Sequence, residues 1–224
     1  MHDPIRAVVF DLDGLMFDTE ALTFRVSSEM LEARGKAFTP EIMRAMIGRR
    51  AVDAGHVLKT MTGLDEPVEV LLADVRQRFY SLMETAVHPT PGLFVLLDHL
   101  RRKAVPIAVA TSSGRAYAER LLVQHRLRDR FAFVLAAEDV RLGKPDPEIY
   151  ALAIERFAVA PGSVMVLEDS PAGIAAARGS GAVAVGVPHE HSPAEALHAA
   201  DLIVPRLDAP ALLARLEIHE RKQQ

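Results

Sequence analysis

Residues 5–14 read IRAVVFDLDG, an apolar run that stops at two aspartates and a glycine. A short apolar run that ends in polar residues predicts a strand buried on both faces. Alternate side chains of an extended chain share a face, so we expect Asp11 and Asp13 to project to the same side where the strand ends. Taken alone, an Asp-X-Asp sequence is more typical of a turn or a helix cap.

The rest of the chain repeats this strand pattern and alternates it with helical patterns. Further short apolar runs occur at 106–110, 131–135, 164–167, 182–187 and 202–204. Between most of them lie helical spacings, such as Leu93, Leu96, Leu97 and Leu100 on one helix face. Alternating strands and helices indicate an α/β fold, a Rossmann-like parallel sheet with helices on both of its faces.

One block interrupts the alternation. From about residue 15 to residue 87 the sequence favours only helices, among them 21–33, 40–46 and 67–85, and HPTPG at 88–92 marks the return to the sheet. We interpret 17–87 as an inserted, all-helical cap domain, and 1–16 with 88–224 as the α/β core, the catalytic domain. The joints near 15–19 and 86–91 are expected to let this cap open and close.

Composition removes several classes of function. The chain has 224 residues, 26 basic and 30 acidic side chains, 5% aromatic residues and no cysteine. Disulfides, thiol nucleophiles and zinc-thiolate sites are therefore excluded, and the acidic balance argues against a nucleic-acid partner. No apolar run approaches the length of about 20 residues that crosses a membrane. The charged N-terminus differs from a signal peptide, so we expect a cytoplasmic protein, with HERKQQ at 219–224 as a frayed helix end.

A second acidic pair follows another predicted strand. The apolar run 164–167 leads directly into Glu168 and Asp169. Ser170 before Pro171 is typical of a helix cap, but capping leaves Glu168 and one of its neighbours unexplained. Paired carboxylates repel one another unless a cation lies beside them, and a hard divalent ion such as Mg²⁺ prefers oxygen ligands.

Two further segments carry complementary chemistry. Thr111-Ser112-Ser113-Gly114 ends a predicted strand before a helix, which indicates an anion site or an ordinary helix cap. Lys144 lies in a loop stiffened by Pro145 and Pro147. All four features are expected at the carboxyl edge of the sheet, where open parallel sheets bind ligands. Together they favour phosphoryl transfer.

These motifs, in this order, resemble the haloacid dehalogenase-like hydrolase superfamily. The resemblance rests on FDLDG at 10–14, TSS at 111–113, GKPDP at 143–147 and LEDSPAGI at 167–174. It covers the whole chain, including a helical cap after the first strand. Within the superfamily, the chain is similar to the branch that contains β-phosphoglucomutase and small sugar-phosphate phosphatases.

The resemblance implies a role for each carboxylate. Asp11 would attack phosphorus to form an aspartyl-phosphate, and Asp13 would protonate the leaving oxygen and then activate water. Mg²⁺ would be held by a side-chain oxygen of Asp11, the backbone carbonyl of Asp13 and Asp169. Glu168 would contact the ion directly or through water.

The resemblance also implies how a substrate is bound. Thr111 and the backbone of Ser112 would hold the phosphoryl oxygens, and Lys144 would balance the charge around them. Four further residues are candidate contacts to the rest of the substrate, namely Gly48, Arg49 and Arg50 in the cap and Arg115 after the TSSG turn. The two cap arginines are equally typical of a solvated helix start.

Three functions remain open at this point. Asp13 argues against dehalogenases, which lack that aspartate, and Thr23 replaces a histidine of β-phosphoglucomutase, so we expect a Mg²⁺-dependent phosphatase of small phosphomonoesters. A sugar phosphomutase is the alternative, and an idle phosphate- or partner-binding protein is the third. The expected partner is a small phosphorylated metabolite, and the expected state is a monomer or a weak homo-oligomer. His189 and His191 are interpreted as an incidental pair.

Overall fold

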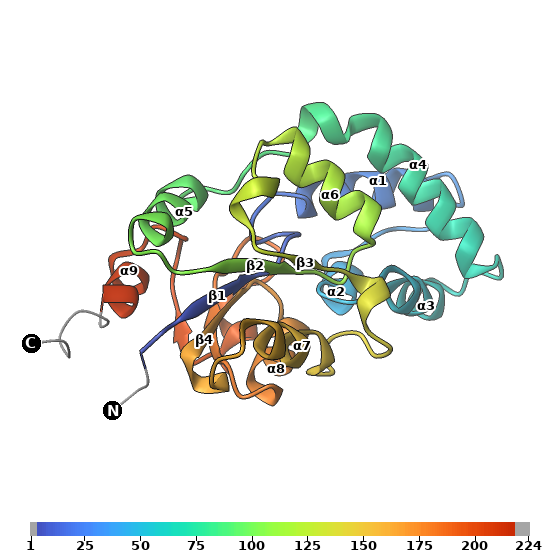
Figure 1. Cartoon of the computed structure of the whole chain (residues 1–224). Coiled ribbons are helices and arrows are strands. Elements are labelled where there is room, and N and C mark those ends of the chain that lie inside the picture. Colours follow the sequence, from blue (N-terminus) through green and yellow to red (C-terminus); the bar gives the residue numbers. More distant parts are fainter. Residues whose placement is uncertain (1–3, 218–224) are drawn as a thin grey trace, which may run out of the picture.

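A computed structural model describes residues 4–217 and shows a six-stranded, fully parallel sheet in the order β3-β2-β1-β4-β5-β6 (Figure 1). The strands are β1 (Ala7–Phe10), β2 (Ile107–Ala110), β3 (Val134–Leu135), β4 (Val164–Glu168), β5 (Val183–Gly186) and β6 (Leu202–Ile203). The strand that opens the sequence is thus at the centre, and all of its residues are buried. The predicted α/β fold class is confirmed.

Helices cover both faces of this sheet, as Figure 1 shows. The helices of the core are α5 (Leu93–Arg102), α6 (Arg115–Gln124), α7 (Glu148–Phe157), α8 (Pro171–Gly179) and α9 (Pro210–Glu217). Val8 and Phe10 join an apolar cluster with α5, α6 and α9, whereas Ala7 and Val9 join one with α7 and α8. The alternation of side chains along β1 therefore supplies both halves of the core.

Most strand boundaries differ from the predicted ones by one or two residues, and the largest difference is in β3. The predicted strand 131–135 is reduced to its last two residues. Phe131 follows a 3₁₀ turn, but its ring is buried edge-on against Phe10 at 5.8 Å, which explains why it resembles strand sequence. The short 3₁₀ turns are η1 (Arg128–Arg130), η2 (Ala137–Asp139), η3 (Pro161–Ser163) and η4 (Ala194–Leu197).

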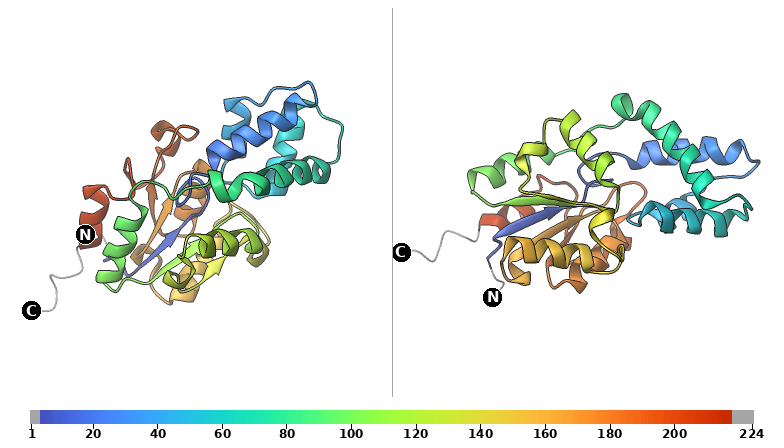
Figure 2. Two further views of the ribbon diagram at one scale, coloured as in Figure 1. Left: turned by 90° about the horizontal axis from the view of Figure 1, so that it is seen from above. Right: turned by 45° about the vertical axis from the view of Figure 1, so that its right-hand side comes forward.

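Four helices form a separate lobe beyond the carboxyl edge of the sheet (Figure 2). They are α1 (Glu20–Glu32), α2 (Pro40–Met46), α3 (Ala51–Thr62) and α4 (Val68–Ala86). These helices share an apolar cluster of their own, which includes Met30, Met43, Leu58 and Leu71. Helix α3 lies within the block predicted to be helical, although its bounds were not predicted. We call residues 20–86 the cap, while the domain limits at 16/17 and 87/88 stay a prediction.

The two segments that join the cap to the core run side by side. The amide of Asp18 donates to the carbonyl of His88, and the amide of Thr90 donates to the carbonyl of Met16, both at 2.9 Å. The Thr90 hydroxyl also donates to the carbonyl of Leu15 at 2.6 Å. Entry and exit of the cap are therefore tied together next to the end of β1.

Two sequence expectations concern segments outside the sheet. Within residues 4–217, no helix is both long and apolar enough to cross a membrane. The expected frayed end at 219–224 lies outside the described residues.

Candidate active site

Three neighbouring strands bring the predicted site residues to one edge. Asp11 follows β1, Thr111 follows β2, and Glu168 is the last residue of β4. The Asp11 amide still donates to the Leu167 carbonyl at 3.0 Å, so the sheet hydrogen bonds extend into the site and fix its backbone. This is the carboxyl edge of a parallel sheet, as the sequence predicts.

Lys144 lies among the acidic residues although it comes from a different loop. Its ammonium group donates to Asp11, to Glu168 at 2.7 Å and to the Ala110 carbonyl at 3.2 Å. The lysine is only 3% exposed. Burial by itself would lower the pKa of Lys144, but the charges of Asp11 and Glu168 outweigh it and raise that pKa. Lys144 is therefore a permanent buried cation.

Both oxygens of the Glu168 carboxylate accept hydrogen bonds from several protein donors. Besides Lys144, it accepts the hydroxyl of Tyr150 at 2.6 Å and that of Ser170 at 2.9 Å. The amides of Asp169 and Ser170 donate to it as well, each at 3.1 Å. Burial opposes ionisation of Glu168, but Lys144 and these donors lower its pKa. Glu168 is thus held as an anion that fixes Lys144 in place.

Three buried carboxylates are close enough to share a metal ion. One oxygen each from Asp11, Glu168 and Asp169 lies within 4.8 Å of the others, and Lys144 supplies a single positive charge among them. Burial raises the pKa of Asp11 and of Asp169 well above the usual aspartate value, and neighbouring carboxylates raise it further. An all-oxygen donor set with excess buried negative charge fits a hard divalent cation such as Mg²⁺.

Gly14 of the opening motif makes room for this cluster. Its φ is +76°, and a Cβ atom there would lie 2.2 Å from Oδ2 of Asp169. Any side chain would therefore be strained and would also displace a carboxylate. The sharp turn after β1 and the close approach of Asp169 both require glycine.

The Asp13 side chain lies outside the cluster of three carboxylates and has partners of its own. Its Oδ2 accepts the Ser113 hydroxyl at 2.6 Å and lies 3.5 Å from the Thr111 hydroxyl. Its Oδ1 accepts the hydroxyl of Tyr117 at 2.7 Å. Asp11 and Asp13 therefore have different surroundings, which suits two different chemical roles. The metal contact of the Asp13 carbonyl stays a prediction.

The cap reaches the site through the predicted Gly48-Arg50 segment. The Gly48 carbonyl accepts the Ser112 hydroxyl at 2.9 Å, and a Cβ at Gly48 would lie 2.3 Å from Ser170 Oγ. The guanidinium of Arg50 donates to the Arg141 carbonyl at 2.9 Å, so Arg50 docks the cap on the core.

The other two candidate substrate contacts, Arg49 and Arg115, already have partners within the protein. Arg49 is exposed, and its Nε donates to the Ala45 carbonyl at 2.9 Å within the cap. Arg115 is paired with Asp139, and it also donates to the Val134 carbonyl at 3.2 Å. A substrate would have to displace Asp139 to use this guanidinium. Both assignments stay predictions.

Sequence reasoning missed two ionisable residues beside the site. Glu20, in the first turn of α1, is buried, and burial followed by the charges of Asp169 and Asp13 raises its pKa to about 8. His189, interpreted as incidental, lies 2.9 Å from Asp169 Oδ2. Both line a cavity of about 310 Å³ next to Gly14. Acidic residues are common in the first turn of a helix because they interact favourably with the helix dipole. The position of Glu20 in the sequence therefore gives no sign that it lies beside the site.

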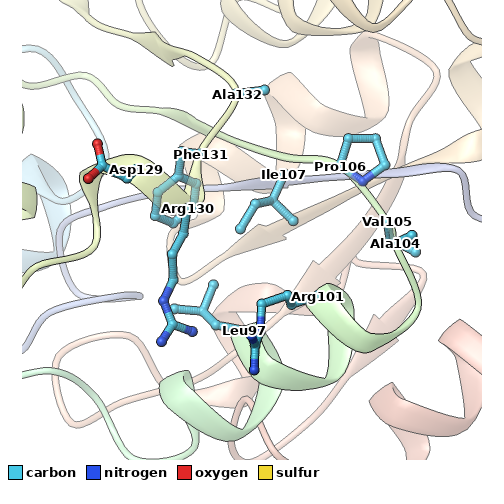
Figure 3. A pocket seen from close by; sticks show the side chains of 10 residues that line it. All are labelled: Leu97, Arg101, Ala104, Val105, Pro106, Ile107, Asp129, Arg130, Phe131 and Ala132. Atoms are coloured by element: carbon cyan, nitrogen blue, oxygen red, sulfur yellow. The ribbon is translucent and has the colours of Figure 1, made fainter.

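A larger hollow lies at the opposite, amino edge of the sheet (Figure 3). This pocket of about 500 Å³ lies between the end of α5 and the starts of β2 and β3. Its charged residues, such as Asp129 and Arg130, are exposed, and Arg130 pairs with Asp98 at 2.8 Å on the surface. Size therefore does not mark the site. The candidate site is distinguished instead by buried charged groups that are paired with one another.

The fold and the site together define a capped α/β protein with a buried carboxylate cluster at the carboxyl edge of its parallel sheet. The sequence comparison agrees with this class. The chain belongs to the haloacid dehalogenase-like hydrolase family, whose pattern matches residues 8–187. The predicted resemblance is thereby confirmed.

Individual relatives indicate the reaction. A phosphorylated carbohydrates phosphatase of Thermotoga maritima is 31% identical over 194 residues, covering 86% of this chain and 90% of that protein. A validoxylamine A 7'-phosphate phosphatase of Streptomyces hygroscopicus subsp. limoneus is 33% identical over 201 residues, covering 89% and 92%. The crystal structure of CbbY from Rhodobacter sphaeroides in complex with phosphate has a TM-score of 0.82 at 27% identity, covering 96% of this chain and 100% of that one. The two phosphatases among these relatives support the predicted phosphatase over the mutase.

Proposed function

We propose that this chain is a Mg²⁺-dependent phosphatase of small phosphorylated sugars and polyols that acts through a phosphorylated Asp11. One observation carries the proposal. Asp11, Lys144, Glu168 and Asp169 form a buried charged cluster at the carboxyl edge, directly beneath the cap. The names of the relatives support the substrate class, because one is a phosphatase of phosphorylated carbohydrates and another a phosphatase of fructose 1-phosphate.

In the proposed reaction the two aspartates have separate roles. An oxygen of Asp11 attacks phosphorus, and the bond from phosphorus to the leaving oxygen breaks while that oxygen takes a proton from Asp13. Water then attacks the phosphorylated Asp11, with Asp13 accepting a proton from it. Product release returns both carboxyl groups to their starting states.

The remaining residues hold the charge that moves during the reaction. Lys144 already contacts Asp11 and lies beside the phosphoryl position, so it offsets the negative charge that builds up there. The Thr111 hydroxyl, at the end of β2, and the Ser112 amide would bind phosphoryl oxygens. The Ser112 hydroxyl contacts the cap instead.

The cation would be held by Asp11 and Asp169, with Glu168 adding charge. Both oxygens of Glu168 already accept hydrogen bonds from protein donors, which makes it the weakest direct ligand of the three. When bound, Mg²⁺ would neutralise the carboxylates and polarise a phosphoryl oxygen. Burial and neighbouring carboxylates raise the pKa of Asp11 and of Asp169, and the repulsion among these carboxylates supports this assignment.

A substrate panel tests the proposed class. Phosphate release should be measured with hexose phosphates, glycerol phosphate, phosphoglycolate and nucleoside monophosphates, and ranked by kcat/KM. Polyol phosphates should rank first, and a chelator should abolish release until excess Mg²⁺ is added. Conversion of β-glucose 1-phosphate into glucose 6-phosphate faster than phosphate release would favour the mutase.

The Asp11→Asn variant tests the nucleophile. Because the amide cannot form an acyl-phosphate, turnover should fall by at least about 1,000-fold with every phosphate in the panel. The Asp129→Asn variant is the matched control, since this exposed carboxylate lies at the amino edge (Figure 3). Its kinetics should equal those of the wild type. Comparable activity in the two variants would exclude Asp11 as nucleophile.

A further inference from the structure

Tyr117 is an aromatic residue of the core that directly contacts the Asp13 carboxyl group. It is the third residue of α6 and reaches back across the turn after β2, where its hydroxyl donates to Oδ1 of Asp13 at 2.7 Å. The other oxygen, Oδ2, accepts the Ser113 hydroxyl at 2.6 Å and lies 3.5 Å from the Thr111 hydroxyl. The two oxygens of Asp13 are therefore not equivalent.

The cap holds the ring of Tyr117 from the other side. Phe79 and Tyr80 of α4 both pack edge-on against it, with ring centroids 5.9 Å and 6.2 Å away. The guanidinium of Arg120, one turn further along α6, lies over the Tyr80 ring at 5.6 Å and pairs with Glu84 at 2.6 Å. A ring packed between α6 and α4 places its hydroxyl with little freedom, so the bond to Asp13 is preorganised.

Of the two oxygens of Asp13, Oδ2 is the one in contact with Ser113 and Thr111, next to the residues expected to bind phosphate. Thr111, which is adjacent to Oδ2, ends β2 at the proposed phosphoryl site, whereas Oδ1 faces the aromatic cluster of α4 and α6. We infer that Tyr117 is a positioning residue that occupies Oδ1 of Asp13 and thereby leaves Oδ2 as the oxygen that exchanges the proton. This inference rests on the proposed function, because it assigns an oxygen to the proton transfer of that reaction.

The step balances with the groups already present. In the first half-reaction the proton on Asp13 Oδ2 moves to the leaving oxygen as its bond to phosphorus breaks and the bond from Asp11 to phosphorus forms. In the second half-reaction Oδ2 takes a proton from water. Tyr117 keeps its own proton throughout and donates to Oδ1. Ser113 can reorient its hydroxyl, since a serine oxygen both donates and accepts.

The test compares Tyr117→Phe with Tyr80→Phe. Both variants lose one hydroxyl from the same aromatic cluster, but within the described residues the Tyr80 hydroxyl makes no hydrogen bond. Each is assayed with glycerol 3-phosphate, whose alkoxide needs a proton to leave, and with 4-nitrophenyl phosphate, whose phenolate does not. Because kcat/KM reports the steps through phosphorylation of Asp11, the ratio of the two values isolates proton donation.

Tyr117→Phe should lower kcat/KM for glycerol 3-phosphate by about 10- to 100-fold and leave the value for 4-nitrophenyl phosphate within about twofold. Tyr80→Phe should leave the ratio unchanged. Partial unfolding would lower both values together, so the ratio stays informative. An unchanged ratio in Tyr117→Phe, or an equal change in both variants, would overturn the inference.

A structural measurement separates this inference from the proposed function. A crystal structure of Tyr117→Phe should show the Asp13 carboxyl group rotated away from its wild-type position. An unmoved carboxyl group would overturn the positioning role even in a fully active enzyme. A wild-type chain that hydrolyses neither phosphate would refute the proposed phosphatase function, while the comparison of Asp13 positions would still decide the role of Tyr117.

Discussion

The carboxyl edge of the sheet and the cap above it are built in opposite ways. At the edge, Lys144 and Glu168 are almost fully buried and each has several partners. In the cap, Arg49 is exposed, and the Gly48 carbonyl meets the core through one serine hydroxyl. Rigid buried charges suit steps common to all substrates, whereas an exposed cap side chain such as Arg49 suits selection among them. This division predicts that a substitution at the carboxyl edge changes kcat/KM equally for all substrates. A substitution in the cap should change the ranking of the substrates.

Removal of the buried cation should have the largest effect. Lys144→Met leaves Asp11 and Glu168 without their shared counter-charge. We expect a loss of at least about 100-fold in kcat/KM for every phosphate, together with a decrease of about 3 kcal/mol in the free energy of unfolding. Steady-state kinetics and urea unfolding measure the two effects. Lys36→Met, at an exposed cap position, should change neither.

If Lys144→Met altered the ranking of substrates while leaving the activity for the best one intact, the division between core and cap would be wrong. A similar fall in kcat/KM for aryl and sugar phosphates would support the division between core and cap.

A smaller, substrate-dependent effect is expected from the cap contact at Gly48. A Cβ there would lie 2.3 Å from Ser170 Oγ, so Gly48→Ala should push the cap away from the core. We expect a fall of about tenfold in kcat/KM for sugar phosphates, mainly through KM, and a smaller fall for 4-nitrophenyl phosphate. The measurement is a comparison of both substrates.

Gly63→Ala is the matched control. Its φ of +66° resembles the +79° of Gly48, but nothing lies within 4 Å of the added Cβ. Both variants share the backbone strain of about 1 kcal/mol, and only Gly48→Ala should alter kinetics. Equal kinetics in the two variants would show that the Gly48 contact does not position the cap.

The smallest effect should be confined to the stability of the cap. The Arg78 hydrogen bond, assisted by Arg34, lowers the pKa of Asp74. A lowered carboxyl pKa adds stability above the unfolded pKa of about 3.9, and this contribution disappears as the pH falls through the folded value. Because these side chains are partly exposed, Asp74→Asn should cost only about 0.5–1 kcal/mol at pH 7.

Urea unfolding measures the difference in the free energy of unfolding between the wild type and Asp74→Asn. This difference should be smaller at pH 3 than at pH 7. Asp65→Asn, an exposed position in the same cap, should match the wild type at both pH values. The kinetics of both variants should be unchanged. A difference that grew towards acid pH would contradict the sign of the pKa shift.

The fold was largely predictable because its signals are local. Ala7–Phe10 is apolar on both faces and ends at Asp11, and five further apolar runs mark the other strands, so the parallel sheet could be predicted from the sequence. Helix α3 lies in the block that the sequence predicts to be helical, but its bounds were not predicted from AVDAGHVLKTMT, which contains an internal glycine. In the structure, Gly55 lies tightly against Val68, which only the packed cap reveals.

Within the site, the residues at strand ends were predictable and their partners were not. Strand register alone brings Asp11, Thr111 and Glu168 to one edge. Tyr150 and Tyr117 lie on helices, and each reaches the site through tertiary packing. His189 was dismissed as one of an incidental pair because no spacing in the sequence links it to Asp169, 20 residues away in the chain.

The paired hydrogen bonds between Met16 and Thr90 and between Asp18 and His88 also bear on how such a protein can diversify. Because the two ends of the inserted helices meet, a short turn could join residues 16 and 90 with a small entropy of loop closure. The two joints of the helical block therefore lie close enough together to accept a different insert. Replacing the block would alter what reaches Asp11 without disturbing the order of the strands that carry the chemistry.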